Sequence, residues 1–328
     1  MCLPLELKFG CRTQISLFTR EFTELGAFTP SRPSKMPVEQ SHASLRHPPS
    51  GAKETAHQAL RQESAALYTD WAADIDRAID QHRAMHDKFG PLPSLVSYWR
   101  IIWTMALTGR VLHLGVPGDI VETGVFTGGS TISMLHVVKM ETASDHDLRP
   151  PRLWACDSFQ GTPAPVGQDK SCNSIMEDSG VIKRSCKEGA AHKYSVGRSV
   201  FESNLRTFDV PAHHSHVHVV EGWYNETLPP KGLKQVSFLR LDGDMYTSTR
   251  DALVALYPLV VPGAIIYVDD YGSFGGCALA VDEFLKNQSG TPPVLHRILE
   301  PSHHYWWLHW FVTSSKPFFF EAVWWVKP

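Results

Sequence analysis

Short apolar segments alternate with longer amphipathic segments between about residues 118 and 287. The short segments are nearly continuous in apolar residues, which is typical of strands buried on both faces of a parallel sheet. In the longer segments apolar residues recur at helical intervals, which predicts helices. We therefore expect an α/β fold in which a doubly wound, mostly parallel sheet carries helices on both faces. The predicted strands cover 119–124, 152–158, 217–222, 237–244 and 264–270, and the predicted helices cover 129–141, 197–208, 247–257 and 277–287.

The same patterning divides the chain into three regions. Residues 1–55 are dense in Pro, Ser and His, which predicts a poorly ordered leader. Helical spacing over 56–115 predicts extra N-terminal helices, which could cap the sheet or form oligomer contacts. Residues 116–328 are expected to form the ligand-binding domain. Within it the polar stretch 160–196 interrupts the alternation, and a loop of this length predicts a lid, a binding loop or a disordered insert.

Composition narrows the class of protein. The chain has 328 residues, of which 43% are apolar and 20% charged, and its formal net charge is -3. This near balance, without a Lys/Arg stripe, disfavours a nucleic-acid partner. The six cysteines have no CxxC spacing and predict free thiols in a reducing compartment. No secretory signal or spanning segment is recognisable, so we expect a cytoplasmic protein without a membrane partner.

The aromatic C-terminal stretch, 304–328, is interrupted by Ser-Ser-Lys-Pro before it could cross a membrane. We expect it to add strands at one edge of the sheet.

A glycine-rich turn, "VETGVFTGGST", joins the first predicted strand to its helix. Glycines allow a ligand to approach the backbone closely, and a helix N-terminus offers free N–H groups. The turn is not GxGxxG, because Phe126 replaces the middle glycine, so it suits a carboxylate or a ribose better than a pyrophosphate. A tight strand–helix turn without a ligand is the alternative. The candidate ligand-binding residues here are Glu122, Thr123, Gly124, Gly128 and Ser130.

The next two strand ends extend this candidate pocket. Asp157 ends the second strand, where an acidic residue can bind both hydroxyls of a ribose, and Ser158 and Phe159 follow it. Gly222 and Trp223 follow the third strand, and the Trp223 indole could enclose an adenine or could simply pack in the core. Taken in order, the three strand ends predict a nucleoside pocket.

Two further strands end in paired carboxylates, Asp242 with Asp244 and Asp269 with Asp270. Crowded carboxylates repel one another, so their placement at one edge suggests a hard cation such as Mg²⁺. Such an ion would bind two neighbouring hydroxyls of a substrate and lower their pKa, and Asp244 could accept the proton. Calcium or manganese could replace magnesium. Alternatively the aspartates cap helices or face water.

The segments "GDIVETGVFTGGS", "ACDSFQGTP", "EGWYNETLP", "LRLDGDMYTST" and "LVVPGAIIYVDDY" resemble, in order and spacing, the macrocin-type (TylF-like) sugar O-methyltransferases. The resemblance covers about residues 90–290, and "AVWWVKP" is similar to the closing strand of that family. It implies a class I methyltransferase (Rossmann-like) fold, S-adenosyl-L-methionine and Mg²⁺ as cofactors, and a homo-oligomer.

The resemblance also implies roles for individual residues. Asp242, Asp269 and Asp270 match the metal ligands, and Asp244 matches the general base. The turn residues named above, with Asp157, Ser158, Phe159, Gly222, Trp223 and Asp242, fall where that family binds the methyl donor. The insert 160–196 and the segment 301–320 depart from the family pattern, which bears on the choice of acceptor.

These observations favour an S-adenosylmethionine- and Mg²⁺-dependent O-methyltransferase acting on a hydroxyl of a sugar or a glycosylated natural product. The partner is then a small hydroxylated acceptor. A catechol or other phenolic diol would bind the same metal and is the alternative acceptor. A nucleotide-dependent oxidoreductase is a competing interpretation, which Phe126 and the four aspartates disfavour. A non-catalytic scaffold of the same fold is another, which the intact carboxylates disfavour.

Overall fold

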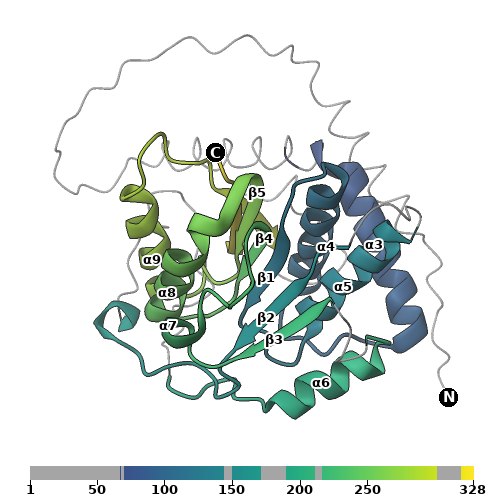
Figure 1. Cartoon of the computed structure of the whole chain (residues 1–328), viewed down its shortest axis with the longest axis horizontal. Coiled ribbons are helices and arrows are strands. Elements are labelled where there is room, and N and C mark those ends of the chain that lie inside the picture. Colours follow the sequence, from purple (N-terminus) through teal and green to yellow (C-terminus); the bar gives the residue numbers. More distant parts are fainter. Residues whose placement is uncertain (1–66, 68–69, 144–149, 171–189, 211–215, 301–318) are drawn as a thin grey trace, which may run out of the picture.

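The computed structural model describes residues 67, 70–143, 150–170, 190–210, 216–300 and 319–328. One seven-stranded sheet with the strand order β3-β2-β1-β4-β5-β7-β6 forms its centre (Figure 1). The strands are β1 (Asp119–Thr123), β2 (Leu153–Asp157), β3 (Val217–Glu221), β4 (Val236–Leu241), β5 (Val260–Val268), β6 (His296–Glu300) and β7 (Phe319–Val326).

Helices cover both faces of this sheet (Figure 1). Residues of α3, α4, α5 and α6 share a core with one face, and residues of α8 and α9 share a second core with the other. The longer helices are α3 (Ala72–Phe89), α4 (Tyr98–His113), α5 (Gly129–Thr142), α6 (Arg198–Thr207), α8 (Tyr246–Leu256) and α9 (Gly275–Lys286). The short ones are α7 (Tyr224–Thr227) and the 3₁₀ helices η1 (Gly167–Lys170) and η2 (Tyr257–Leu259).

Strands β1 to β5 run parallel to one another. Because successive side chains of a strand point to opposite faces of the sheet, each strand contributes alternately to the two cores. On β4, for example, Phe238 belongs to the core beneath α4, whereas Leu239 belongs to the core beneath α8 and α9. This double burial is the physical reason for the nearly continuous apolar runs in the sequence.

The C-terminal strand β7 runs antiparallel between β5 and β6. The C-terminal stretch therefore adds a strand to this side of the sheet, but β7 is an inner strand and the edge strand is β6. Residues 304–318 of the stretch lie outside the described residues. Trp71, just before α3, packs edge-on against Trp324 of β7, with ring centroids 5.0 Å apart. The helical segment that precedes the sheet is thus packed against the strand that completes it.

The predicted doubly wound α/β architecture is confirmed, and each of the five predicted strands is present with slightly different bounds. Strand β6 and helix α7 were not predicted: β6 follows the turn residues 288–293, and α7 has only four residues. The leader 1–55 lies outside the described residues, as does 171–189 of the insert. The division at residues 55 and 115 stays a prediction.

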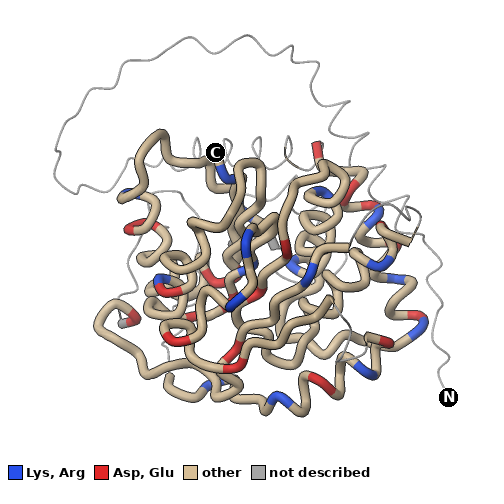
Figure 2. Tube along the Cα trace, viewed as in Figure 1, with Lys and Arg blue, Asp and Glu red and all other residues tan. Residues whose placement is uncertain are grey.

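Charged residues of both signs are interspersed over the described part of the fold (Figure 2). Among its helices, none combines the length and the apolar character that crossing a bilayer requires.

Candidate active site

A cavity of about 460 Å³ opens at the carboxyl ends of the parallel strands. Its wall includes residues after β1, β2, β4 and β5, together with Pro93–Val96 and Arg100 from the segment before the sheet. The volume lies within the range of small-molecule and cofactor sites. Ligands of open α/β sheets bind at this edge, so the cavity is the candidate active site.

The glycine turn between β1 and α5 closely approaches the end of β4. Gly124 has φ of 86°, and a Cβ built on it would overlap the backbone carbonyl of Asp242. Only glycine therefore fits at this position without moving one of the two strands. Gly128 (φ 95°) is the N-cap residue of α5, and the first turn of this helix contributes Ser130 to the cavity wall.

Asp157 organises the turns after β1 and β2. One of its carboxylate oxygens accepts hydrogen bonds from the N–H groups of Val125 (2.8 Å) and Phe126 (3.2 Å). The other accepts from the N–H of Phe159 (2.7 Å). Phe126 and Phe159 both have positive φ, 48° and 53°, a conformation that is unusual for bulky residues and is held here by Asp157. This carboxylate therefore shapes the part of the cavity beside the glycine turn as well as lining it.

Three aspartates meet at the ends of β4 and β5. Asp242, Asp269 and Asp270 each offer a carboxylate oxygen, and these oxygens lie within 4.8 Å of one another. Burial raises the pKa of Asp242 and raises that of Asp270 well above its usual value, with neighbouring carboxylates adding to the effect. Asp244 has φ of 58°, and its N–H donates to Asp270 (3.1 Å), so it sits on the rim of the same cluster.

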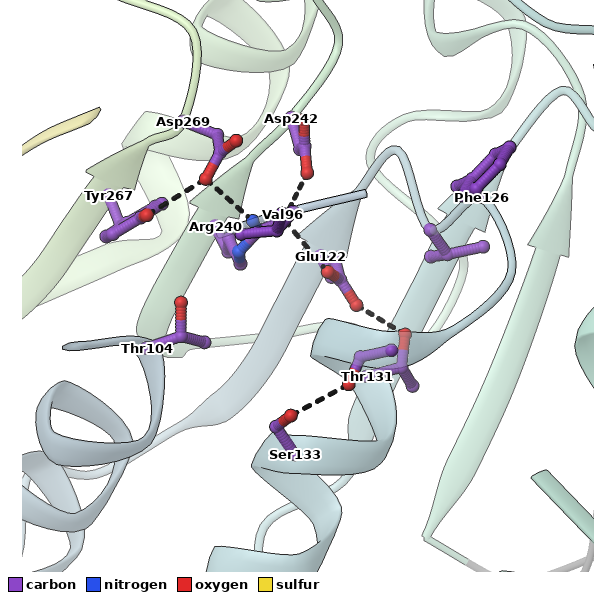
Figure 3. A network of polar contacts seen from close by, with 12 residues as sticks. Val96, Thr104, Glu122, Phe126, Thr131, Ser133, Arg240, Asp242, Tyr267 and Asp269 are labelled. Carbon is purple, nitrogen blue, oxygen red and sulfur yellow. Dashed lines mark hydrogen bonds and ion pairs between the residues drawn. The ribbon is translucent and has the colours of Figure 1, made fainter. Parts of the chain in front are cut away.

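Two guanidinium groups form ion pairs with carboxylates of this cluster. Arg240 donates to Glu122 (3.1 Å), Asp242 (2.6 Å) and Asp269 (2.8 Å), as Figure 3 shows. Arg100 of α4 forms ion pairs with Asp269 and, at 2.7 Å, with Glu321 of β7. The cluster is therefore assembled from α4, β1, β4, β5 and β7.

Glu122 is fully buried on β1, where it accepts hydrogen bonds from Arg240 and from the Thr131 hydroxyl (Figure 3). Burial raises its pKa to about 7, against the opposing effect of Arg240.

Charge and ligand chemistry fit a divalent cation. Five acidic side chains, Glu122, Asp242, Asp269, Asp270 and Glu321, surround two basic ones, Arg100 and Arg240. If all seven side chains are ionised, this cluster carries three uncompensated negative charges, and its side chains have little exposure to solvent. The candidate ligand atoms are all carboxylate oxygens, which suits Mg²⁺, Ca²⁺ or Mn²⁺ better than zinc.

The structure brings most of the predicted site residues to the cavity and leaves some behind it. Glu122, Thr123, Gly128, Phe159 and Gly222 lie outside its lining. Those that line it are Gly124, Ser130, Asp157, Ser158, Trp223, Asp242, Asp244, Asp269 and Asp270.

The described ends of the insert also reach this cavity. The N–H of Thr162 donates to the carbonyl of Lys193 (2.9 Å), which joins the two ends at a narrow neck. Further along, the buried carboxylate of Asp169 accepts the N–H groups of Val166 (2.8 Å) and Tyr246 (2.7 Å), which fixes this segment to the start of α8. Whether the insert is a lid stays a prediction.

Sequence reasoning missed Arg100, Arg240, Glu321 and Asp169. The first three had a recognisable signal, because each is a charged residue inside an apolar run: "YWRIIW", "SFLRL" and "FFFEAVWW". Charged residues that are forced into a core are paired there, so such positions indicate a buried ion-pair network. Asp169 had no comparable signal within a polar stretch.

The strand order with β7 antiparallel, the glycine turn after β1 and the acidic residue that ends β2 define the class I methyltransferase fold. A sequence model of the macrocin O-methyltransferase (TylF) family matches residues 38–306, and the chain belongs to this family. The resemblance drawn from the sequence motifs is thereby confirmed.

Individual relatives agree with this assignment. The chain is 36% identical over 178 residues to demethyldecarbamoylnovobiocin O-methyltransferase of Streptomyces niveus, which covers 53% of this chain and 60% of the relative. It is 33% identical over 188 residues to 8-demethyl-8-(2,3-dimethoxy-alpha-L-rhamnosyl)-tetracenomycin-C 4'-O-methyltransferase of Streptomyces olivaceus. This match covers 56% of this chain and 64% of the relative. The chain thus spans less than two thirds of the length of these curated relatives.

Among solved structures, that of the O-methyltransferase NovP is similar with a TM-score of 0.54 and 28% identity, covering 73% of this chain and 83% of that one. The agreement in fold extends well beyond the motifs that carry the candidate site.

Proposed function

We propose that this protein is an S-adenosylmethionine- and Mg²⁺-dependent O-methyltransferase that methylates a hydroxyl of a sugar or a glycosylated natural product. The observation that carries the proposal is that one cavity is lined by both the glycine turn with Asp157 and the acidic cluster at the ends of β4 and β5. Family membership and the names of the two relatives, both O-methyltransferases of natural products, support the reaction and the class of acceptor.

On the donor side, Gly124, Ser130, Asp157 and Trp223 would hold S-adenosylmethionine. The methyl group on its sulfonium sulfur would be transferred, and the rest of the molecule would leave as S-adenosylhomocysteine. Gly124 lets the turn lie against the backbone of Asp242, and Asp157 keeps the turns after β1 and β2 in place through three N–H groups.

On the acceptor side, Asp242, Asp269 and Asp270 would hold Mg²⁺, which lowers the pKa of a coordinated hydroxyl. Asp244, on the rim beside Asp270, would take the proton from that hydroxyl. The acceptor oxygen gains the methyl group and loses its proton to Asp244, so no covalent enzyme intermediate is needed. A phenolic diol would use the same residues and is the alternative acceptor.

A nucleotide-dependent oxidoreductase, considered from the sequence alone, is disfavoured by membership of a methyltransferase family. The homo-oligomeric state and the cytoplasmic location stay predictions.

Calorimetric titration with S-adenosylhomocysteine tests the donor site, with NADH as the control ligand. We expect saturable binding of S-adenosylhomocysteine and none of NADH; the reverse result would overturn the proposed reaction. Transfer of a labelled methyl group to a panel of glycosides and phenolic diols, with and without Mg²⁺, then identifies the acceptor class. Transfer that persists in the presence of a chelator would overturn the metal requirement.

A further inference from the structure

Arg240 occupies an unusual place for a charged residue, near the carboxyl end of the central strand β4. Its side chain has no solvent exposure. Its neighbours in sequence, Leu239 and Leu241, are apolar and buried, and the strands on both sides are parallel core strands. A guanidinium in such a place costs free energy unless it is paired, so its partners indicate why the fold contains it.

These partners are three carboxylates on three adjacent strands. One terminal nitrogen donates to Glu122 of β1 (3.1 Å) and to Asp242 after β4 (2.6 Å). The other donates to Asp269 after β5 (2.8 Å). Two of the three carboxylates, Asp242 and Asp269, belong to the proposed metal site, and the third anchors Arg240 from the opposite side (Figure 3).

The guanidinium group of Arg240 also selects one oxygen atom of each of these two aspartates. It takes Oδ2 of Asp242 and Oδ1 of Asp269. The Tyr267 hydroxyl donates to the same Oδ1 of Asp269 at 2.9 Å. Arg100 donates to the other oxygen of Asp269, Oδ2. Directional hydrogen bonds from guanidinium groups therefore orient both carboxylates, and Arg240 is the group that joins Asp242 to Asp269. A planar group with donors in fixed directions does this in a way that a point charge does not.

We propose that Arg240 is a positioning residue that pre-orients Asp242 and Asp269 for a divalent cation. This inference rests on the proposed function, because it assumes that the acidic cluster binds Mg²⁺. Groups that hydrogen-bond to metal ligands without touching the metal typically change metal affinity by 10–100-fold when they are replaced.

Charge alone would have the opposite effect. A fixed positive charge beside a cation site repels the cation, so removal of Arg240 would tighten cation binding if repulsion were its main effect. The substitution Arg240→Lys separates the two effects, because lysine keeps the charge but cannot donate to three carboxylates in the fork geometry.

The experiment is calorimetric titration of metal-free protein with Mg²⁺, in the absence of a methyl donor. We expect Arg240→Lys to weaken Mg²⁺ binding by about 10–100-fold. Affinity for S-adenosylhomocysteine should change far less, and methyl transfer should recover as the Mg²⁺ concentration is raised. A merely structural role would instead lower donor binding and methyl transfer in parallel, without rescue by Mg²⁺.

A second variant keeps the test decisive if Arg240→Lys does not fold. Tyr267→Phe removes a neutral donor to the same Asp269 oxygen and changes no charge. We expect it to weaken Mg²⁺ binding, by less than Arg240→Lys does. The matched control is Tyr257→Phe, another buried tyrosine that does not line the cavity, and it should leave Mg²⁺ affinity unchanged.

The possible failures are distinguishable. If the wild-type protein binds no Mg²⁺, the metal role in the proposed function is wrong. If the wild-type protein binds Mg²⁺ and the folded variants bind it equally or more tightly, the inference about Arg240 is wrong while the proposed function stands.

Discussion

The close approach of the glycine turn to β4 can be tested by Gly124→Ala. Gly124 has φ of 86°, and an added Cβ would lie 2.7 Å from the carbonyl carbon of Asp242 and closer still to its oxygen. Ordinary contact begins near 3.4 Å, so the carbonyl carbon alone requires the two strand ends to separate by about 0.7 Å, and the nearer oxygen requires more. Both partners are backbone atoms, and no side-chain rotation can relieve the overlap.

The expected cost has two parts. A left-handed conformation costs a residue with a Cβ about 1–2 kcal/mol. Overpacking between two fixed segments adds about 1–3 kcal/mol. Together they give about 2–5 kcal/mol, of which only the second part reflects contact with Asp242. Each kcal/mol should lower Tm by about 2–4 °C for a protein of this size.

The matched control is Gly263→Ala. Gly263 has nearly the same φ, 83°, but an added Cβ there would meet nothing within 4 Å. Thermal unfolding should therefore show a larger fall in Tm for Gly124→Ala than for Gly263→Ala. Calorimetry should show loss of S-adenosylhomocysteine affinity in the former alone, because the turn and Asp242 both line the cavity. Equal falls in Tm with donor affinity retained in both variants would refute the rigid contact.

Three further predictions concern separate parts of the site. Asp169→Ala should lower the free energy of unfolding by about 1 kcal/mol. It should also speed hydrogen exchange at the amides of Val166 and Tyr246, because both lose their acceptor; unchanged exchange would contradict the anchoring role. The pKa of Glu122 is raised from 4.5 to about 7. Protonated Glu122 therefore contributes about 3 kcal/mol to the free energy of unfolding below pH 4.5, and this contribution is lost as the pH rises to about 7. Glu122→Gln should therefore flatten the fall in stability over this range in denaturant titrations, and an unaltered slope would show that another group titrates there. Asp244→Asn should lower kcat by about 100-fold or more while leaving S-adenosylhomocysteine affinity intact; an unaltered kcat would exclude it as the base.

The sequence predicts the sheet well because burial on both faces leaves a local signature. Each strand that packs between two helical layers is an apolar run, and its end is marked by a glycine or an acidic residue. The aspartates after β4 and β5 could be assigned to one edge because parallel strands bring their carboxyl ends together.

The partners of those aspartates could not be assigned in the same way. Arg100 reaches Asp269 from a helix 169 positions away in the chain, and Glu321 approaches from β7. Nothing in the local pattern gives the distance or direction of such contacts. Glu122 illustrates the same limit: its place near the end of a strand suggested a ligand contact, whereas in the structure its side chain is buried and accepts a hydrogen bond from Arg240.

The ion pair between Arg100 and Glu321 has a consequence for the order in which the protein becomes functional. A chain is synthesised from its N-terminus, and α4 is complete long before β7 has been made. Arg100 can support Asp269 early, but its second partner arrives only with β7, which also separates β5 from β6 in the sheet. A nascent chain that ends before β7 could form β1 to β5 and the glycine turn, yet its acidic cluster would lack one wall. The proposed metal site should therefore be completed late in synthesis, after most of the fold already exists.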